Sequence, residues 1–154
     1  MKLFKVLFLS LGLLSLSLLY TGCEKKDTTG ISEVHWDRDM CARCVMVVSD
    51  RHNSVQVKEP KSGKSYMFDD IGCMVSWFRE KKIAWKDQAT IWVNDVNNGK
   101  WIDARKAFYD TENITPMGYG YSAHKMKSSI KSGKEIIDYN EVVKRILDKK
   151  THSH

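Results

Sequence analysis

The sequence contains no block of charge of a single sign. Its 154 residues include 25 lysines and arginines against 19 aspartates and glutamates, for a formal net charge of +6. The two signs are interspersed along the whole chain, whereas nucleic-acid-binding proteins concentrate basic residues in a patch or stripe. We therefore predict no nucleic-acid partner.

The sequence also lacks a convincing set of acid–base catalytic residues. Asp69 and Asp70 are adjacent and stand directly before an apolar stretch. Neighbouring carboxylates in that position are more typical of a helix cap than of a catalytic pair. We therefore expect that the protein is not an enzyme.

No apolar run in the sequence is long enough for a membrane-spanning helix. Lys2 and Lys5 introduce a short apolar run that ends in two small residues before Cys23, which is the pattern of an export signal. A cysteine in that place resembles a bacterial lipobox, in which the thiol is diacylated and becomes the first residue of the mature protein. Tyr20 departs from the lipobox, which usually has leucine there. An ordinary cleaved signal is the alternative.

This leader sets the expected organisation of the chain. Residues 1–22 form the signal peptide, 23–38 the lipidated cysteine and a flexible tether, 39–150 the folded domain, and 151–154 a disordered tail. Loss of Lys2 and Lys5 lowers the formal charge to +4, and the remaining length fits one domain. Two or three acyl chains on Cys23 would hold the protein firmly on a periplasm-facing membrane, inner or outer.

Cysteines are few, and their number in the mature domain is odd. Apart from Cys23, only Cys41, Cys44 and Cys73 remain. Structural disulfides use cysteines in pairs, so an odd thiol in an exported protein indicates a reactive or metal-bound group.

The apolar pattern predicts an α+β domain. Short strands are expected over residues 45–48, 54–58, 65–68, 90–93 and 100–103, and helices over 71 to about 82 and from 138 onward. Asp69 or Asp70 can cap the first helix, and Asp138-x-x-Glu141 resembles a capping box for the second. Strands followed by a helix occur twice, with a break at 85–87, which favours two related ββαβ-like halves packed as one domain.

The stretch "MCARCVM" places Cys41, Cys44 and Met46 within six positions. A Cys-x-x-Cys pair can form a disulfide, exchange thiols or chelate a metal ion. Redox dithiols of the thioredoxin type lie at a helix N-terminus, but this pair precedes the strand-like residues 45–48. That order disfavours thioredoxin chemistry and leaves a structural disulfide or a metal site.

Cys73 lies in the first turn of the predicted helix if Asp70 is its N-cap. At about 100° per residue, Cys73 points roughly 150° away from the centre of the apolar stripe, so it is not an obvious core residue. The positive end of the helix would favour its thiolate form, which binds metal. The alternative is an inert, buried packing residue.

Met117 lies in a loop between Pro116 and Gly118 rather than on a periodic apolar stripe. The glycines allow this loop to adopt unusual backbone torsions, which would let the Met117 thioether point inward. The alternative is that Met117 fills a gap under the loop. His124 and Met126 could each add a ligand, but we expect both to be satisfied surface residues.

The donor atoms decide which metal is expected. Zinc would use Cys41, Cys44, Cys73 and a histidine, but it leaves the methionines unexplained. Soft thiolate and thioether donors select copper(I). We therefore predict a copper(I) site, with these candidate ligands: Cys41, Cys44, Met46, Cys73 and Met117.

The motifs "MCARCVM", "YMFDDIGCM" and "TPMGYGYSAH", in this order after a lipobox, resemble the NosL family of nitrous oxide reductase accessory proteins over residues 39–124. The resemblance implies paired ββαβ-like halves related to a domain of organomercurial lyase. It also implies a lipid-anchored copper(I) carrier that supplies the copper–sulfide centre of periplasmic nitrous oxide reductase, or another periplasmic copper enzyme.

Residue by residue, the resemblance assigns Cys41, Cys44 and Met46 to the family's Cys-x-x-Cys-x-Met motif and Met117 to its Met-Gly loop. Val45 stands where many members have glycine. Cys73 lies inside a matched stretch, but the resemblance does not fix its role.

A different class of function remains open. An exported thiol–disulfide oxidoreductase would use Cys41 and Cys44 as its active pair and Cys73 as a resolving thiol, with Thr115-Pro116 as a Thr-cisPro beside them. A third possible function, organometal chemistry, is supported only by the fold analogy with organomercurial lyase.

Overall fold

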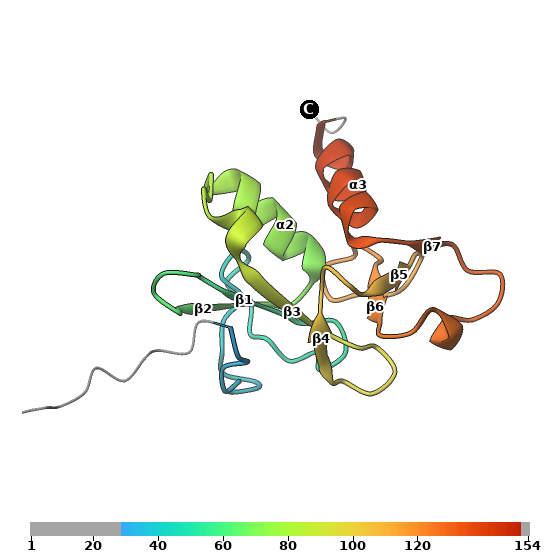
Figure 1. Cartoon of the computed structure of the whole chain (residues 1–154), viewed down its shortest axis with the longest axis horizontal. Helices are drawn as coiled ribbons and strands as arrows, with labels where there is room; N and C mark the ends of the chain where they lie inside the picture. The colour runs from blue at the N-terminus through green and yellow to red at the C-terminus, as the bar shows by residue number, and fades with distance from the viewer. Residues whose placement is uncertain (1–28, 152–154) are drawn as a thin grey trace, which may run out of the picture.

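A computed structural model of the chain describes residues 29–151 (Figure 1). The expected signal peptide, Cys23 and the tail beyond residue 151 lie outside the described residues. Within the described part, no helix combines the length and the apolar character needed to cross a membrane.

The first half of the domain is a four-stranded antiparallel sheet with one helix on its face (Figure 1). Its strands are β1 (Val55–Lys58), β2 (Ser65–Phe68), β3 (Thr90–Asn94) and β4 (Trp101–Asp103), in the order β2-β1-β3-β4. The helix is α2 (Ile71–Glu80), followed by the short 3-10 helix η2 (Lys86–Gln88). Every residue of the central strand β1 is buried, which places the core between this sheet and α2.

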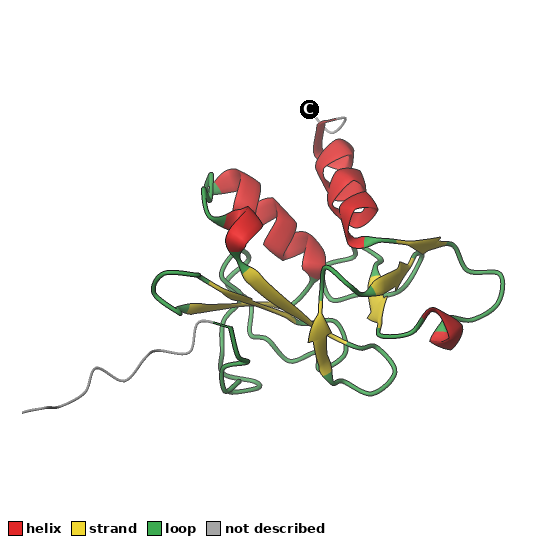
Figure 2. Cartoon of the chain, in the orientation of Figure 1, coloured by secondary structure: helices red, strands yellow, loops and turns green. Residues whose placement is uncertain are grey.

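The second half is smaller and contains more loop (Figure 2). Its antiparallel strands are β5 (Phe108–Asp110), β6 (Ser122–His124) and β7 (Ile136–Ile137), in the order β6-β5-β7. The 3-10 helix η3 (Lys127–Ser129) follows β6, and α3 (Tyr139–Thr151) follows β7 and packs against α2.

The α+β class predicted from the apolar pattern is confirmed, and so are the capped helices. Asp70 caps α2 by accepting a hydrogen bond from Gly72 N at 2.9 Å, and Asp138 accepts one from Glu141 N at 2.8 Å at the start of α3. The two halves divide between β4 and β5, later than the expected break at 85–87. The reason is that β3 pairs directly with β1, so the chain returns to the first sheet after α2.

Two segments near the N-terminus differ from expectation. Residues 45–48 form no strand and contribute only an isolated bridge between Met40 and Val47. Residues 29–38, expected as tether, contact the first sheet. Ser32 exchanges hydrogen bonds with the Gln56 side chain at 2.7 and 3.1 Å, and Trp36 stacks on Trp101.

Candidate metal centre

The loop that carries Cys41 and Cys44 is a tight turn closed by backbone hydrogen bonds. Cys41 N donates to Met46 O at 2.8 Å, and Val45 N donates to Cys41 O at 3.0 Å. Val45 has φ of 60°, in the left-handed region that disfavours a β-branched side chain. A glycine, which the family resemblance leads one to expect at this position, would adopt that conformation without strain.

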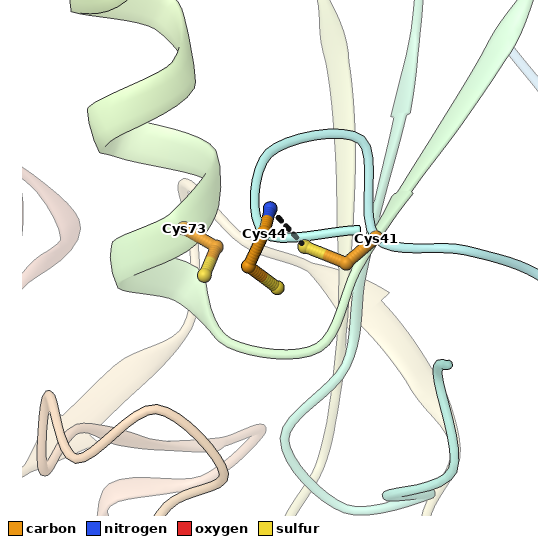
Figure 3. A group of neighbouring side chains, drawn as sticks. All are labelled: Cys41, Cys44 and Cys73. Carbon is orange, nitrogen blue, oxygen red and sulfur yellow. Dashed lines mark hydrogen bonds between the residues drawn. The ribbon is translucent and has the colours of Figure 1, made fainter. Parts of the chain in front are cut away.

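Cys73 approaches the same point from the first turn of α2 (Figure 3). The sulfur atoms of Cys41, Cys44 and Cys73 all lie within 4.8 Å of one another. All three are free thiols. Cys41 and Cys73 are 1% and 0% exposed, and Cys44 is half-buried. A compact, mostly buried trithiol cluster, here called the thiol cluster, therefore joins the loop to the helix.

Cys73 is more buried than its position on the helical wheel indicated. Residues 71–78 of α2 are all buried, because the sheet covers one side of the helix while α3 and the cysteine-bearing loop cover others. The expectation that Cys73 lies away from the core was wrong about burial. Its side chain instead faces the two loop thiols.

Hydrogen bonding concentrates negative charge on Cys41. The Cys73 thiol donates to Cys41 and, against the opposing effect of burial, lowers the pKa of Cys41 to about 4. Cys44 N also points at the Cys41 sulfur, at 3.5 Å (Figure 3). The pKa of Cys73 is raised by the same bond to Cys41 and by burial, and burial raises the pKa of Cys44. The hydrogen bonds therefore favour the thiolate form of Cys41 over that of Cys73, although the helix position had favoured Cys73.

The Met117 loop is fastened to the start of α2 by the buried carboxylate of Asp70. Thr115 Oγ1 donates to Asp70 Oδ2 at 2.7 Å, and Met117 N donates to the same oxygen at 3.3 Å. Gly120 N in turn donates to Thr115 Oγ1 at 3.1 Å. Burial raises the pKa of Asp70 despite these bonds. The segment around Cys73 and the segment around Met117, which are separate motifs in the sequence, therefore contact each other directly.

Tyr119 extends that contact over the helix. A Cβ added to Gly72 would lie 2.0 Å from Tyr119 Cγ, so the ring rests directly on the glycine next to Cys73. The Tyr119 hydroxyl lies 3.2 Å from Ser76 Oγ and 3.4 Å from Arg43 Nη1. Arg43 therefore links the cysteine loop to this tyrosine.

The two predicted methionine ligands have different surroundings. Met46 is 52% exposed and lies on the outer part of the loop. Met117 is partly buried and packs against the core. As copper ligands, both stay predictions.

His124 is not the surface residue that we expected. It is 4% exposed, with Nε2 at 3.1 Å from Asp110 Oδ1 and Nδ1 at 3.1 Å from the Asn97 amide nitrogen. It lies outside the thiol cluster, and both ring nitrogens have protein partners. Met126 is 60% exposed, as expected for a surface residue.

The thiol cluster has the composition of a site for a soft cation. Three thiolates can surround one copper(I) ion, whereas structural zinc requires a fourth ligand. Among the described residues, no histidine, aspartate or glutamate joins the three cysteines. The donor set therefore fits copper(I) better than structural zinc.

Several residues around the cluster lie inside the quoted motifs, but sequence reasoning assigned them no role at a metal site. Arg43 is one of the two residues between the cysteines, Tyr119 belongs to the glycine-containing loop, and Thr115 entered only the oxidoreductase alternative. Gly72, directly before Cys73, was the one available signal, because a glycine inside a helix often marks a close approach.

Comparison with known proteins places the chain in a family. A family model described as NosL matches residues 34–129. The chain therefore belongs to the NosL family, as its motifs indicated.

A solved structure agrees with this assignment at the level of the fold. The chain is similar to the copper chaperone NosL from Shewanella denitrificans, with 16% sequence identity and a TM-score of 0.58. The match covers 77% of this chain and 96% of that chain. A comparison with curated proteins found no match.

Proposed function

We propose that the protein is a copper(I) carrier and that the thiol cluster is where copper binds. The observation that carries the proposal is the approach of three sulfur atoms from two separate elements to within 4.8 Å. Thiolates select copper(I) over harder cations, and the burial of Cys41 and Cys73 would shield the ion from water and oxidants. The half-buried Cys44 and the exposed Met46 stand on the side from which copper would enter and leave.

The expected partner is the apo form of a periplasmic copper enzyme. The resemblance to NosL proteins implies copper delivery for the copper–sulfide centre of nitrous oxide reductase, and the match of the NosL family model to residues 34–129 supports carrying this role over to the chain. We further propose that acyl chains on Cys23 hold the carrier on a membrane facing the periplasm. Replacement of Cys23 by serine should move the protein from the membrane fraction to the soluble fraction, and an unchanged distribution would contradict the anchor.

The copper proposal is tested by anaerobic titration of the reduced chain with copper(I) against a competing chelator. The wild-type protein should bind copper tightly, and the combined change Cys41→Ser and Cys44→Ser should abolish tight binding, because only one thiol of the cluster remains. Met46→Leu and Met117→Leu, measured separately, decide whether either thioether contributes. Undiminished affinity in the double cysteine variant would show that copper binds elsewhere.

A thiol–disulfide oxidoreductase is the second candidate, because the thiolate on Cys41 suits thiol exchange as well as metal binding. Its sequence support is weakened, since no peptide bond in residues 29–151 is cis and Thr115 is engaged with Asp70. Insulin reduction that disappears in Cys41→Ser would favour this function over copper transport.

A further inference from the structure

Arg43 stands between the two loop cysteines in the sequence, and its guanidinium reaches Glu80 at the end of α2. Its Nε lies 3.0 Å from Glu80 Oε2, and its Nη2 lies 2.8 Å from Glu80 Oε1. Its Nη1 reaches the Tyr119 hydroxyl at 3.4 Å, and that hydroxyl lies 3.2 Å from Ser76 Oγ. Cys73, Ser76 and Glu80 follow one another at helical spacing, so these bonds hold the guanidinium on the face of α2 that carries Cys73.

Copper loading creates a charge that this geometry can balance. A copper(I) ion bound by two or three thiolates leaves one or two negative charges in a largely buried site. Uncompensated buried charge is strongly unfavourable, and it is tolerated only with a charged or hydrogen-bonding partner. Arg43, which stands between two of the thiols in the sequence, is a fixed cation whose guanidinium stays protonated at any ordinary pH.

The ion pair with Glu80 does not cancel this charge at the cluster. The Arg43 side chain is 22% exposed, whereas that of Glu80 is 43% exposed. Water therefore screens the carboxylate more than the guanidinium. Glu80 therefore offsets only part of the guanidinium charge, and its bonds to Nε and Nη2 hold the guanidinium in place.

We propose that Arg43 is a positioning residue for the copper site, whose fixed positive charge, held on the face of α2 that carries Cys73, stabilises the anionic copper–thiolate complex. Glu80 and Tyr119 hold the guanidinium in place. The inference rests on the proposed copper function and adds to it the residue that balances the charge of the loaded state.

A matched set of variants separates charge from structure. Arg43→Gln removes the charge and the ion pair, Arg43→Lys keeps the charge, and Glu80→Gln breaks the same ion pair while leaving the positive charge in place. Copper(I) affinity of the full chain is measured anaerobically by chelator competition. The thermal midpoint of each copper-free variant is measured alongside, because it reports folding without copper.

Arg43→Gln should weaken copper binding about 10- to 100-fold, the usual effect of losing a residue that supports a metal ligand. Arg43→Lys should recover part of this loss. Glu80→Gln should weaken copper binding less than Arg43→Gln does, because the charge of Arg43 remains and the glutamine amide oxygen can still accept a hydrogen bond from the guanidinium. Affinity in Arg43→Gln within about twofold of wild type would overturn the inference, since one lost charged contact is worth about tenfold or more. A Glu80→Gln loss as large as that of Arg43→Gln would also overturn it, because the ion pair would then act structurally.

Two further outcomes are distinguishable. If wild type itself binds no copper, the proposed function fails and the inference fails with it. If wild type binds through the cysteines but the Arg43 variants behave like it, only the inference fails. Should Arg43→Gln lower the thermal midpoint enough to unfold the chain, Arg43→Lys and Glu80→Gln decide the question alone.

Discussion

At the scale of single residues, the three thiols are not equivalent. Cys41 receives hydrogen bonds from the Cys73 thiol and from Cys44 N, and it therefore carries the charge of the cluster. Cys73 is a donor, despite its place near the positive end of α2. A short-range contact between two sulfur atoms therefore outweighs the weaker effect of the helix dipole.

The titration of Cys41 gives the first prediction. In the reduced, copper-free protein, the ultraviolet absorbance of one thiolate should appear as pH rises through about 4. Cys73→Ala removes the main stabilising donor, leaves the effect of burial, and should move this transition to higher pH.

Cys73→Ser is the control, because its hydroxyl can still donate and should keep the pKa of Cys41 low. Absence of a thiolate below neutral pH in the wild type would contradict the assignment, as would an unchanged transition in Cys73→Ala.

At the scale of elements, the site depends on the packing of the 115–120 loop against the first turn of α2. Asp70 caps the helix with one carboxylate oxygen and accepts from Thr115 and Met117 with the other. Tyr119 covers Gly72. These contacts fix the height of the loop above the helix, and hence the position of the Met117 backbone relative to Cys73.

The close contact at Gly72 gives the second prediction. Gly72→Ala should lower the free energy of unfolding by about 1–3 kcal/mol, because a methyl group 2.0 Å from the Tyr119 ring forces the loop outward. Urea denaturation measures the change.

The double-variant control uses Tyr119→Ala, which removes the obstructing ring. In that background Gly72→Ala should instead stabilise the protein by about 1 kcal/mol or less, the preference of a helix for alanine over glycine. An equal loss in both backgrounds would mean that the clash is not the cause.

At the scale of the whole molecule, the two halves have separate roles. The first half supplies the thiols, and the second half supplies a buried polar network and the loop that packs on α2 beside Cys73. In that network His124 bonds to Asp110 and Asn97, and Asn113 Nδ2 donates to Asp110 Oδ1 at 2.7 Å. The network stabilises the second half and contributes no atom to the thiol cluster.

Replacement of His124 gives the third prediction. His124→Phe leaves the buried Asp110 carboxylate without its imidazole partner and should destabilise the fold by about 1–3 kcal/mol. Copper(I) affinity should stay unchanged where the variant is folded, because His124 is not in the cluster.

His52, an exposed histidine, is the control. His52→Gln should change stability by about 0.5 kcal/mol or less. A drop in copper affinity in His124→Phe, with the fold intact, would make His124 a ligand and contradict its structural role.

The elements of the first half were largely predictable from sequence, because their signals are local. Strands β1, β2 and β3 have β-branched or aromatic residues over their length, and α2 begins at a capping aspartate. The strands of the second half are two or three residues long. Such short strands depend on pairing with distant segments, so their own residues give no usable period.

The residue types of the candidate site were also predictable, but their arrangement was not. Sequence alone identified the three cysteines, the two methionines and the NosL family, because soft donors and motif order are properties of the chain itself. The burial of Cys73, the lowered pKa of Cys41 and the position of the Arg43 guanidinium on α2 depend on residues up to 76 positions apart. Only the tertiary structure decides these, because hydrogen bonds and burial act between atoms that folding brings together.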